Sequence, residues 1–129
     1  MIGQYHDKNK LIISSTTENR LDYERQEKVL LENLDGLNKR DVTVFTLFGS
    51  GGRISDGTTI TPEETAALQE ELGTSNHDFV VMLQGKDGTE VHRQFEYISG
   101  EKLIDLLDGK DMATQEARAI DSLSDPNAD

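Results

Sequence analysis

The order in which strand and helix patterns alternate is the feature that most limits what this 129-residue chain can fold into. Apolar runs predict strands at 11–14, 42–48 and 79–83, and an alternating run predicts a partly exposed edge strand at 91–95. Amphipathic helices are expected after each of the first two strands and after the fourth. The helical crossovers predict parallel strands, whereas the Asp87-Gly88 turn makes the last two antiparallel. The pattern therefore predicts a three-layer α/β/α domain around a mixed four-stranded sheet, in the order β-α-β-α-β-β-α.

The first helix is predicted from a capping pattern and an apolar stripe. Ser15 and Glu18 have the spacing of a capping box, so the helix is expected to begin there, and Gly36 suits its end. The residues expected to face the core are Tyr23, Leu30, Leu34 and Leu37.

The second helix has the clearest start signal in the chain. Gly49–Gly57 is expected to be a glycine-rich loop, after which Thr61 caps the helix, Pro62 takes its first position and Glu64 completes a capping box. The residues expected to face inward are Ala67, Leu68 and Leu72. Ser99 is expected to cap the last helix, which stops near Gly109.

Length and polarity predict one domain with two polar ends. We expect a flexible segment at 1–9, a domain at 10–109 and a polar tail at 110–129 that is helical at 114–120. The first ten residues contain no apolar stretch typical of a signal peptide, which favours the cytoplasm for the chain as it stands.

Charge and cysteine content exclude several functions. The formal net charge of −12 argues against nucleic acid and anionic membrane surfaces, because both attract basic proteins. No apolar run reaches the length of a membrane-spanning helix. The absence of cysteine excludes disulfides, cysteine-ligated metals and thiol nucleophiles, and with them thiol-disulfide oxidoreductase and peroxiredoxin activity.

The order of elements is that of the thioredoxin-like core, and the stretch from about Lys10 to Arg118 resembles the family called domain of unknown function 4174. This family includes animal sushi-repeat and coiled-coil-containing matrix proteins. The residues that carry the resemblance are Leu11-Ile12-Ile13, Arg25-Gln26, Arg40-Asp41-Val42, Gly85-Lys86-Asp87-Gly88 with Arg93, and Leu103-Ile104-Asp105 leading to Met112 and Glu116.

The resemblance implies the fold and a periplasmic or extracellular location, but no activity. Two positions depart from the expected pattern. Asp108–Met112 replaces a Met-Pro-Met-Arg-like turn after the last helix. His77-Asp78 stand where redox relatives of the fold place a proline before the third strand, which agrees with the missing cysteines.

Ser15–Asn19 takes the place where redox members of the fold keep their cysteines. Thr16, Thr17 and Asn19 could bind an anion at the N-terminus of the first helix, or they could serve only as helix-capping residues. The other candidate ligand-binding residues are His77 and a proposed basic cluster of Arg53, Lys86 and Arg93, for which surface ion pairs are the alternative.

The sequence contains no recognisable cofactor or metal motif. Gly49–Arg53 lacks the spacing of a dinucleotide fingerprint and of a P-loop. The three histidines, His6, His77 and His92, lack metal-ligand spacing. A calcium loop starting at Asp105 fails because Lys110 replaces the required glycine.

These observations favour a non-redox module that binds a protein or a small ligand, as a monomer or weak homodimer, without a cofactor. Two alternatives stay open: a cysteine-independent enzyme that uses carboxylates with His77 or His92, and an exported structural or adhesive domain.

Overall fold

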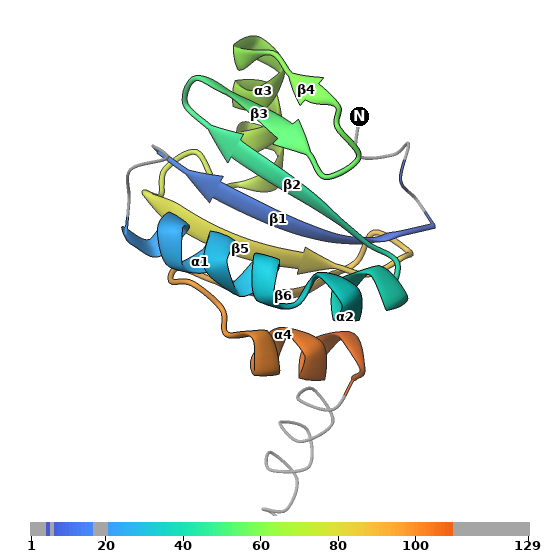
Figure 1. The fold of residues 1–129 in the computed structure, drawn as a ribbon. Helices are drawn as coiled ribbons and strands as arrows, with labels where there is room; N and C mark the ends of the chain where they lie inside the picture. The colour runs from blue at the N-terminus through green and yellow to red at the C-terminus, as the bar shows by residue number, and fades with distance from the viewer. Residues whose placement is uncertain (1–4, 6, 17–20, 110–129) are drawn as a thin grey trace, which may run out of the picture. The chain divides into compact units, whose positions relative to one another are not determined.

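The structure, a computed structural model, describes residue 5 and residues 7–16 and 21–109, and it divides into two units, Met1–Ile98 and Ser99–Asp129. In the first unit six strands form one sheet, in the order β4-β3-β2-β1-β5-β6 (Figure 1). The strands are β1 (Asn9–Ser15), β2 (Val42–Phe48), β3 (Gly51–Ile54), β4 (Thr59–Ile60), β5 (Phe79–Gln84) and β6 (Glu90–Gln94). The helices of this unit are α1 (Leu21–Glu32), α2 (Leu34–Lys39) and α3 (Pro62–Leu72).

Four strands, in the order β6-β5-β1-β2, make the predicted mixed sheet. β1 runs parallel to β2, and β6 is antiparallel to β5 as the Asp87-Gly88 turn requires. β5 is antiparallel to β1, so the expected parallel crossover into β5 is wrong. Every residue from Phe79 to Leu83 is buried, which confirms that β5 is a central strand.

The sheet lies between two helical layers because its apolar side chains alternate between the two faces. On one face Ile12, Phe45 and Met82 form a buried cluster with Leu68 of α3. On the other face Val44 and Thr46 line a cavity together with residues of α1 and α2. Figure 1 shows α1 and α2 along one side of the strands and α3 beside β3 and β4. The predicted three-layer arrangement is therefore confirmed.

The predicted loop Gly49–Gly57 contains β3, which together with β4 raises the strand count from four to six. β3 pairs antiparallel with β2, and β4 pairs antiparallel with β3. The glycines that suggested a loop are needed for packing. A side chain at Gly52 would approach the Thr46 carbonyl oxygen, and Gly51 has a φ of +129°. Glycine here permits a close strand contact.

The predicted first helix is two helices, and its predicted cap is wrong. Ser15 is the last residue of β1 and pairs with Phe79, and Glu18 lies outside the described residues. The Asn33 side chain donates a hydrogen bond to the Val29 carbonyl (2.7 Å), an interaction that competes with the helical ladder where α1 ends. The interruption changes the helical phase, and Leu34 is 50% exposed instead of facing the core.

The start of α3 is as predicted. Thr61 accepts a hydrogen bond from the backbone of Glu64 (3.1 Å), and the Glu64 carboxylate accepts one from the backbone of Thr61 (3.2 Å). The buried face of α3 differs from the predicted one at one position. Ala67, which was expected to face inward, is exposed, and Thr65 is buried together with Leu68.

The second unit contains α4 (Gly100–Leu107). The Ser99 hydroxyl accepts a hydrogen bond from the backbone of Lys102 (3.2 Å), which confirms the predicted cap. Gly109, with a φ of +79°, follows the helix as expected. The helix predicted at 114–120 lies outside the described residues. None of the helices described is long and apolar enough to cross a membrane.

Candidate functional site

A polar cavity of about 230 Å³ opens at the end of the sheet where β1 and β2 finish. Residues from four segments surround it, and most of them carry hydroxyl, amide or imidazole groups. The lining residues are Ser15, Thr16, Gly49, Gln69, Thr74, Ser75 and His77. Ligands of open α/β sheets commonly bind outside the carboxyl ends of the strands, so the position agrees with a binding site.

Backbone hydrogen bonds hold the walls of this cavity together. The Thr16 amide donates to the Asp78 carbonyl (3.0 Å), which ties the end of β1 to the start of β5. The Thr74 amide donates to the Gln69 carbonyl (2.8 Å) just after α3, whose C-terminal cap is Gly73 with a φ of +74°. These contacts place Thr16 and Thr74 on walls that α3 and the sheet support.

Side chains fix two further parts of the wall. Gln69 donates from its amide nitrogen to the Ser14 hydroxyl (3.1 Å), so its orientation is set from β1. The His77 ring lies against Phe95 with a centroid separation of 4.5 Å. Phe95 is itself 54% exposed, so an accessible aromatic ring lies beside His77, which is one of the lining residues.

The structure brings together two of the residues that the sequence singled out, Thr16 and His77. Thr17 and Asn19 lie outside the described residues, so the predicted anion site is not described as a whole. Gly49, Gln69, Thr74 and Ser75 were missed. They come from three separate segments, and no local pattern in the sequence marks them as neighbours.

The proposed basic cluster does not exist as a cluster. Arg53 lies on β3 and Arg93 on β6, with β2, β1 and β5 between them in the sheet. Lys86 lies in the turn between β5 and β6, where it forms an ion pair with Asp41 (3.0 Å). This ion pair lowers the pKa of Asp41, through a hydrogen bond from Lys86 and then its charge.

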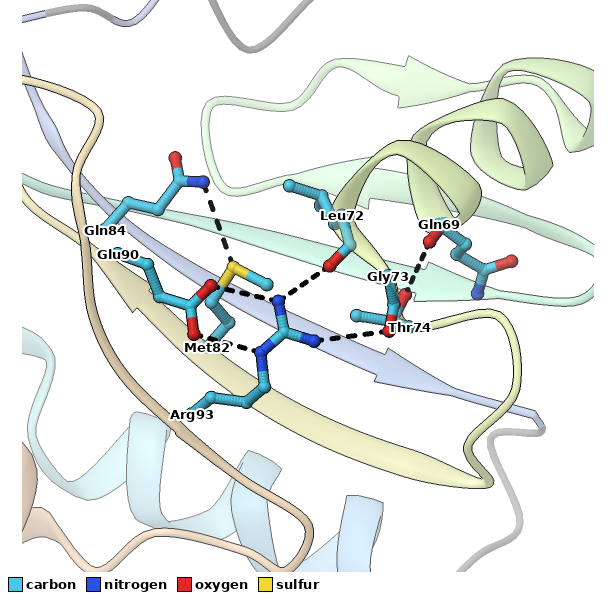
Figure 2. Close-up of polar contacts among 8 residues, drawn as sticks. All are labelled: Gln69, Leu72, Gly73, Thr74, Met82, Gln84, Glu90 and Arg93. Atoms are coloured by element: carbon cyan, nitrogen blue, oxygen red, sulfur yellow. Dashed lines mark hydrogen bonds and ion pairs between the residues drawn. The ribbon is translucent and has the colours of Figure 1, made fainter.

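Arg93 binds the C-terminal end of α3 (Figure 2). Its guanidinium donates to the carbonyl oxygens of Leu72 (2.7 Å) and Gly73 (3.2 Å) and makes two bonds of 3.0 Å with the Glu90 carboxylate. A cation at a helix C-terminus satisfies carbonyl groups that have no partner within the helix. Arg93 thus connects the edge strand β6 to α3.

Glu90 contributes a pH-dependent part of this connection. Hydrogen bonds from Arg93 lower the pKa of the Glu90 carboxyl below its ordinary value. A group with a lowered folded-state pKa stabilises the fold above its unfolded-state pKa, and loses that effect as the pH falls through the folded-state value.

We therefore expect Glu90→Gln to lower the free energy of unfolding at pH 7 by about 0.5 kcal/mol, a small effect because the pair is partly exposed. Urea unfolding from pH 7 to pH 2 should show the difference from wild type vanishing at the acid end. In an Arg93→Gln background the same change should have almost no further effect. A difference that stays constant down to pH 2 would contradict this role.

Unlike Lys86 and Arg93, Arg53 lies next to Tyr23 of α1. Its guanidinium donates to the Tyr23 hydroxyl (2.9 Å) and lies 5.4 Å from the centre of the Phe48 ring. Burial raises the pKa of Tyr23, and the charge of Arg53 opposes that shift.

Among the described residues, no group of three or more His, Asp or Glu side chains is placed to bind a metal ion. His92 lies on β6, with its Nε2 2.6 Å from the Gln94 amide oxygen, and it does not line the polar cavity. Of the two histidines named for a cysteine-independent enzyme, His77 alone lies in the cavity.

Comparison with known proteins identifies the family and the fold. A family model described as a domain of unknown function (DUF4174) matches residues 2–116. No curated protein matches the chain. The reduced 2-Cys peroxiredoxin of Plasmodium vivax is similar in structure with a TM-score of 0.60 at 14% identity, over 88% of this chain and 84% of that one. Mycobacterium tuberculosis AhpC gives a TM-score of 0.57 at 9% identity, over 88% and 74%. Identities this low show the fold alone, and the thioredoxin-like fold predicted from the sequence is confirmed.

Proposed function

Because this chain belongs to the family described as a domain of unknown function (DUF4174), whose description assigns no activity, we propose its function from the polar cavity. The proposal is a non-redox binding module that takes a small, uncharged, polar ligand at the ends of β1 and β2. The observation that carries it is the composition of the cavity wall, which presents hydroxyl, amide and imidazole groups. Without cysteine the chain has no thiol to perform redox chemistry at this position.

The chemistry of the wall favours ligands with several hydroxyl or amide groups. Ser15, Thr16 and Ser75 can both donate and accept hydrogen bonds, and Gln69 adds an amide. Among the lining residues that the structure describes there is no carboxylate, lysine or arginine to select a charged ligand. The exposed ring of Phe95 beside His77 offers an apolar surface for a sugar ring or a short peptide.

The proposal is tested by thermal unfolding in the presence of neutral mono- and disaccharides, small amides and short uncharged peptides. A ligand that binds only the folded state stabilises it by about 1.4 kcal/mol at ten times its Kd, so a bound compound raises the Tm. Thr16→Val should weaken binding about tenfold, because it leaves a polar group of the ligand without its partner.

Two further variants separate the cavity from the rest of the surface. His77→Phe keeps a ring against Phe95 and removes the ring nitrogens, so it should also weaken binding. Lys86→Gln changes the opposite end of the sheet and should leave binding unchanged. Binding that Thr16→Val and His77→Phe do not alter would overturn the site, and turnover of peroxide or a disulfide by the purified protein would overturn the function.

A further inference from the structure

A second cavity, of about 180 Å³, lies between α1, α2, β2 and β3, away from the polar cavity. Its wall is mainly apolar. The apolar lining residues are Leu30, Leu31, Leu34, Leu37 and Val44. Leu31 and Leu34 are 64% and 50% exposed, so the groove is open to solvent and ligands can reach it. Its volume is well below the roughly 300–1,000 Å³ of pockets for drug-sized ligands, which limits an occupant to a small molecule.

A positive and a negative side chain, Arg53 and Glu27, lie next to this apolar wall. The hydroxyl group of Tyr23 forms a hydrogen bond with each of them. Arg53 donates a hydrogen bond to the Tyr23 hydroxyl (2.9 Å), and that hydroxyl donates to the Glu27 carboxylate (3.3 Å). All three residues line the same cavity. The guanidinium and the carboxylate are therefore separated by no more than these two hydrogen bonds placed end to end.

Neither charge is neutralised by an ion pair in the part of the chain that the structure describes. In the ranges that the structure describes, Arg53 contacts the Tyr23 hydroxyl and the face of the Phe48 ring, and these contacts leave most of its five N–H donors available. Within the described residues, the Glu27 carboxylate accepts a hydrogen bond from Tyr23 alone. Tyr23 is buried and packs edge-on against Phe48 at 4.9 Å, so the hydroxyl between the charges has a fixed position.

We propose that this groove binds a free α-amino acid with an apolar side chain. The carboxylate of the ligand pairs with Arg53, its ammonium group pairs with Glu27, and its side chain lies against the leucines. A fatty acid or an alkylamine supplies only one of the two charges, and a residue inside a peptide supplies neither. A second copy of this chain does not fit as well, because each copy carries a net charge of −12.

The test is an NMR titration of the uniformly ¹⁵N-labelled protein with L-leucine, and with 4-methylpentanoate and 3-methylbutylamine as analogues that carry one charge each. L-leucine should shift the backbone amides of 30–37 and 53 and should bind at least threefold more tightly than either analogue. Absence of shifts in these residues, or equal binding of 4-methylpentanoate, would overturn the proposal.

Two variants assign the charges separately. Arg53→Gln should weaken L-leucine about fivefold and also weaken 4-methylpentanoate. Glu27→Gln should weaken L-leucine and 3-methylbutylamine, but strengthen 4-methylpentanoate because it removes a repulsive charge. Leu34→Ser, at a half-exposed position, should weaken L-leucine without changing either charge, and Lys86→Gln is the control that should change nothing. L-leucine binding that is unchanged in both charge variants would exclude the assigned roles.

Discussion

Replacing Gly52 by alanine should destabilise the protein by about 3 kcal/mol, at the upper end of what overpacking a tight contact costs. A methyl group at this position would lie 2.6 Å from the Thr46 carbonyl oxygen and 3.3 Å from the Thr65 hydroxyl. The first contact is with backbone of the neighbouring strand β2, which cannot rotate away as a side chain can. To relieve this contact β3 must move away from β2, and to relieve the second contact α3 must move away from β3.

Urea unfolding at pH 7 measures the effect as a lower transition midpoint, and the slope of the transition should not change if the unfolded state is unaffected. Gly49→Ala is the matched control, because its nearest new contact is 3.5 Å from the Thr16 carbonyl oxygen, an ordinary distance. The control should change the free energy of unfolding by no more than about 0.5 kcal/mol. Equal effects of the two substitutions would show that the close approach of β3 to β2 is not important for stability.

Gly52 also shows why β3 was absent from the sequence-based prediction. Four glycines in nine residues are typical of a loop, and no alternation of polar and apolar residues marks 51–54 as a strand. The strand forms because the backbone of β2 offers partners and because Thr65 of α3 packs where a side chain would otherwise be. Both conditions come from segments distant in sequence, which local propensity does not represent.

The elements that were predicted correctly carry their signals locally. Thr61 and Glu64 are three residues apart, and the Asp87-Gly88 turn needs only its own two residues, with Gly88 at a φ of +86°. β5 was recognisable because five consecutive apolar residues have no polar alternation. The direction of β5 relative to β1 was not recognisable, because it depends on the added hairpin and on where α3 crosses the sheet.

The candidate sites also divide into residues that the sequence could indicate and residues that depend on contacts between distant segments. Thr16 and His77 could be named because both positions follow from the order of elements, one after the first strand and one before β5. The groove beside Tyr23 could not be predicted, because Glu27 and Arg53 come from α1 and β3 and β3 itself was not expected. The sequence suggested Arg53 as a ligand-binding residue, but grouped it with Lys86 and Arg93 from other parts of the sheet.

Gln26 is expected to be the most important polar side chain for stability, and Gln26→Leu should lower the free energy of unfolding by about 3 kcal/mol. Its side chain is completely buried and makes two hydrogen bonds to the backbone of Ile98. The amide nitrogen donates to the Ile98 carbonyl (3.1 Å), and the Ile98 amide donates to the side-chain oxygen (2.7 Å). Leucine has a similar size but leaves both backbone groups buried without a partner, at roughly 1–3 kcal/mol each.

The two hydrogen bonds between Gln26 and Ile98 also explain why a polar residue lies within the apolar stripe of α1. Gln26 lies one turn after Tyr23 on the buried face of the helix, and it fixes the chain at Ile98, seventy-two residues later in the sequence. A side chain that hydrogen-bonds to both backbone groups of one residue specifies the register of that contact, which an apolar side chain cannot do.

Gln84→Leu is the matched control for Gln26→Leu, because it makes the same substitution where the amide is poorly satisfied. The Gln84 side-chain oxygen is buried without a hydrogen-bond partner in the described structure, and its nitrogen contacts only the Met82 sulfur at 3.8 Å. Removing this amide should be neutral or slightly stabilising. Urea unfolding of the two variants under identical conditions should therefore differ by at least about 2 kcal/mol. If both variants unfold at the wild-type urea concentration, the contact between Gln26 and Ile98 is not a significant source of stability.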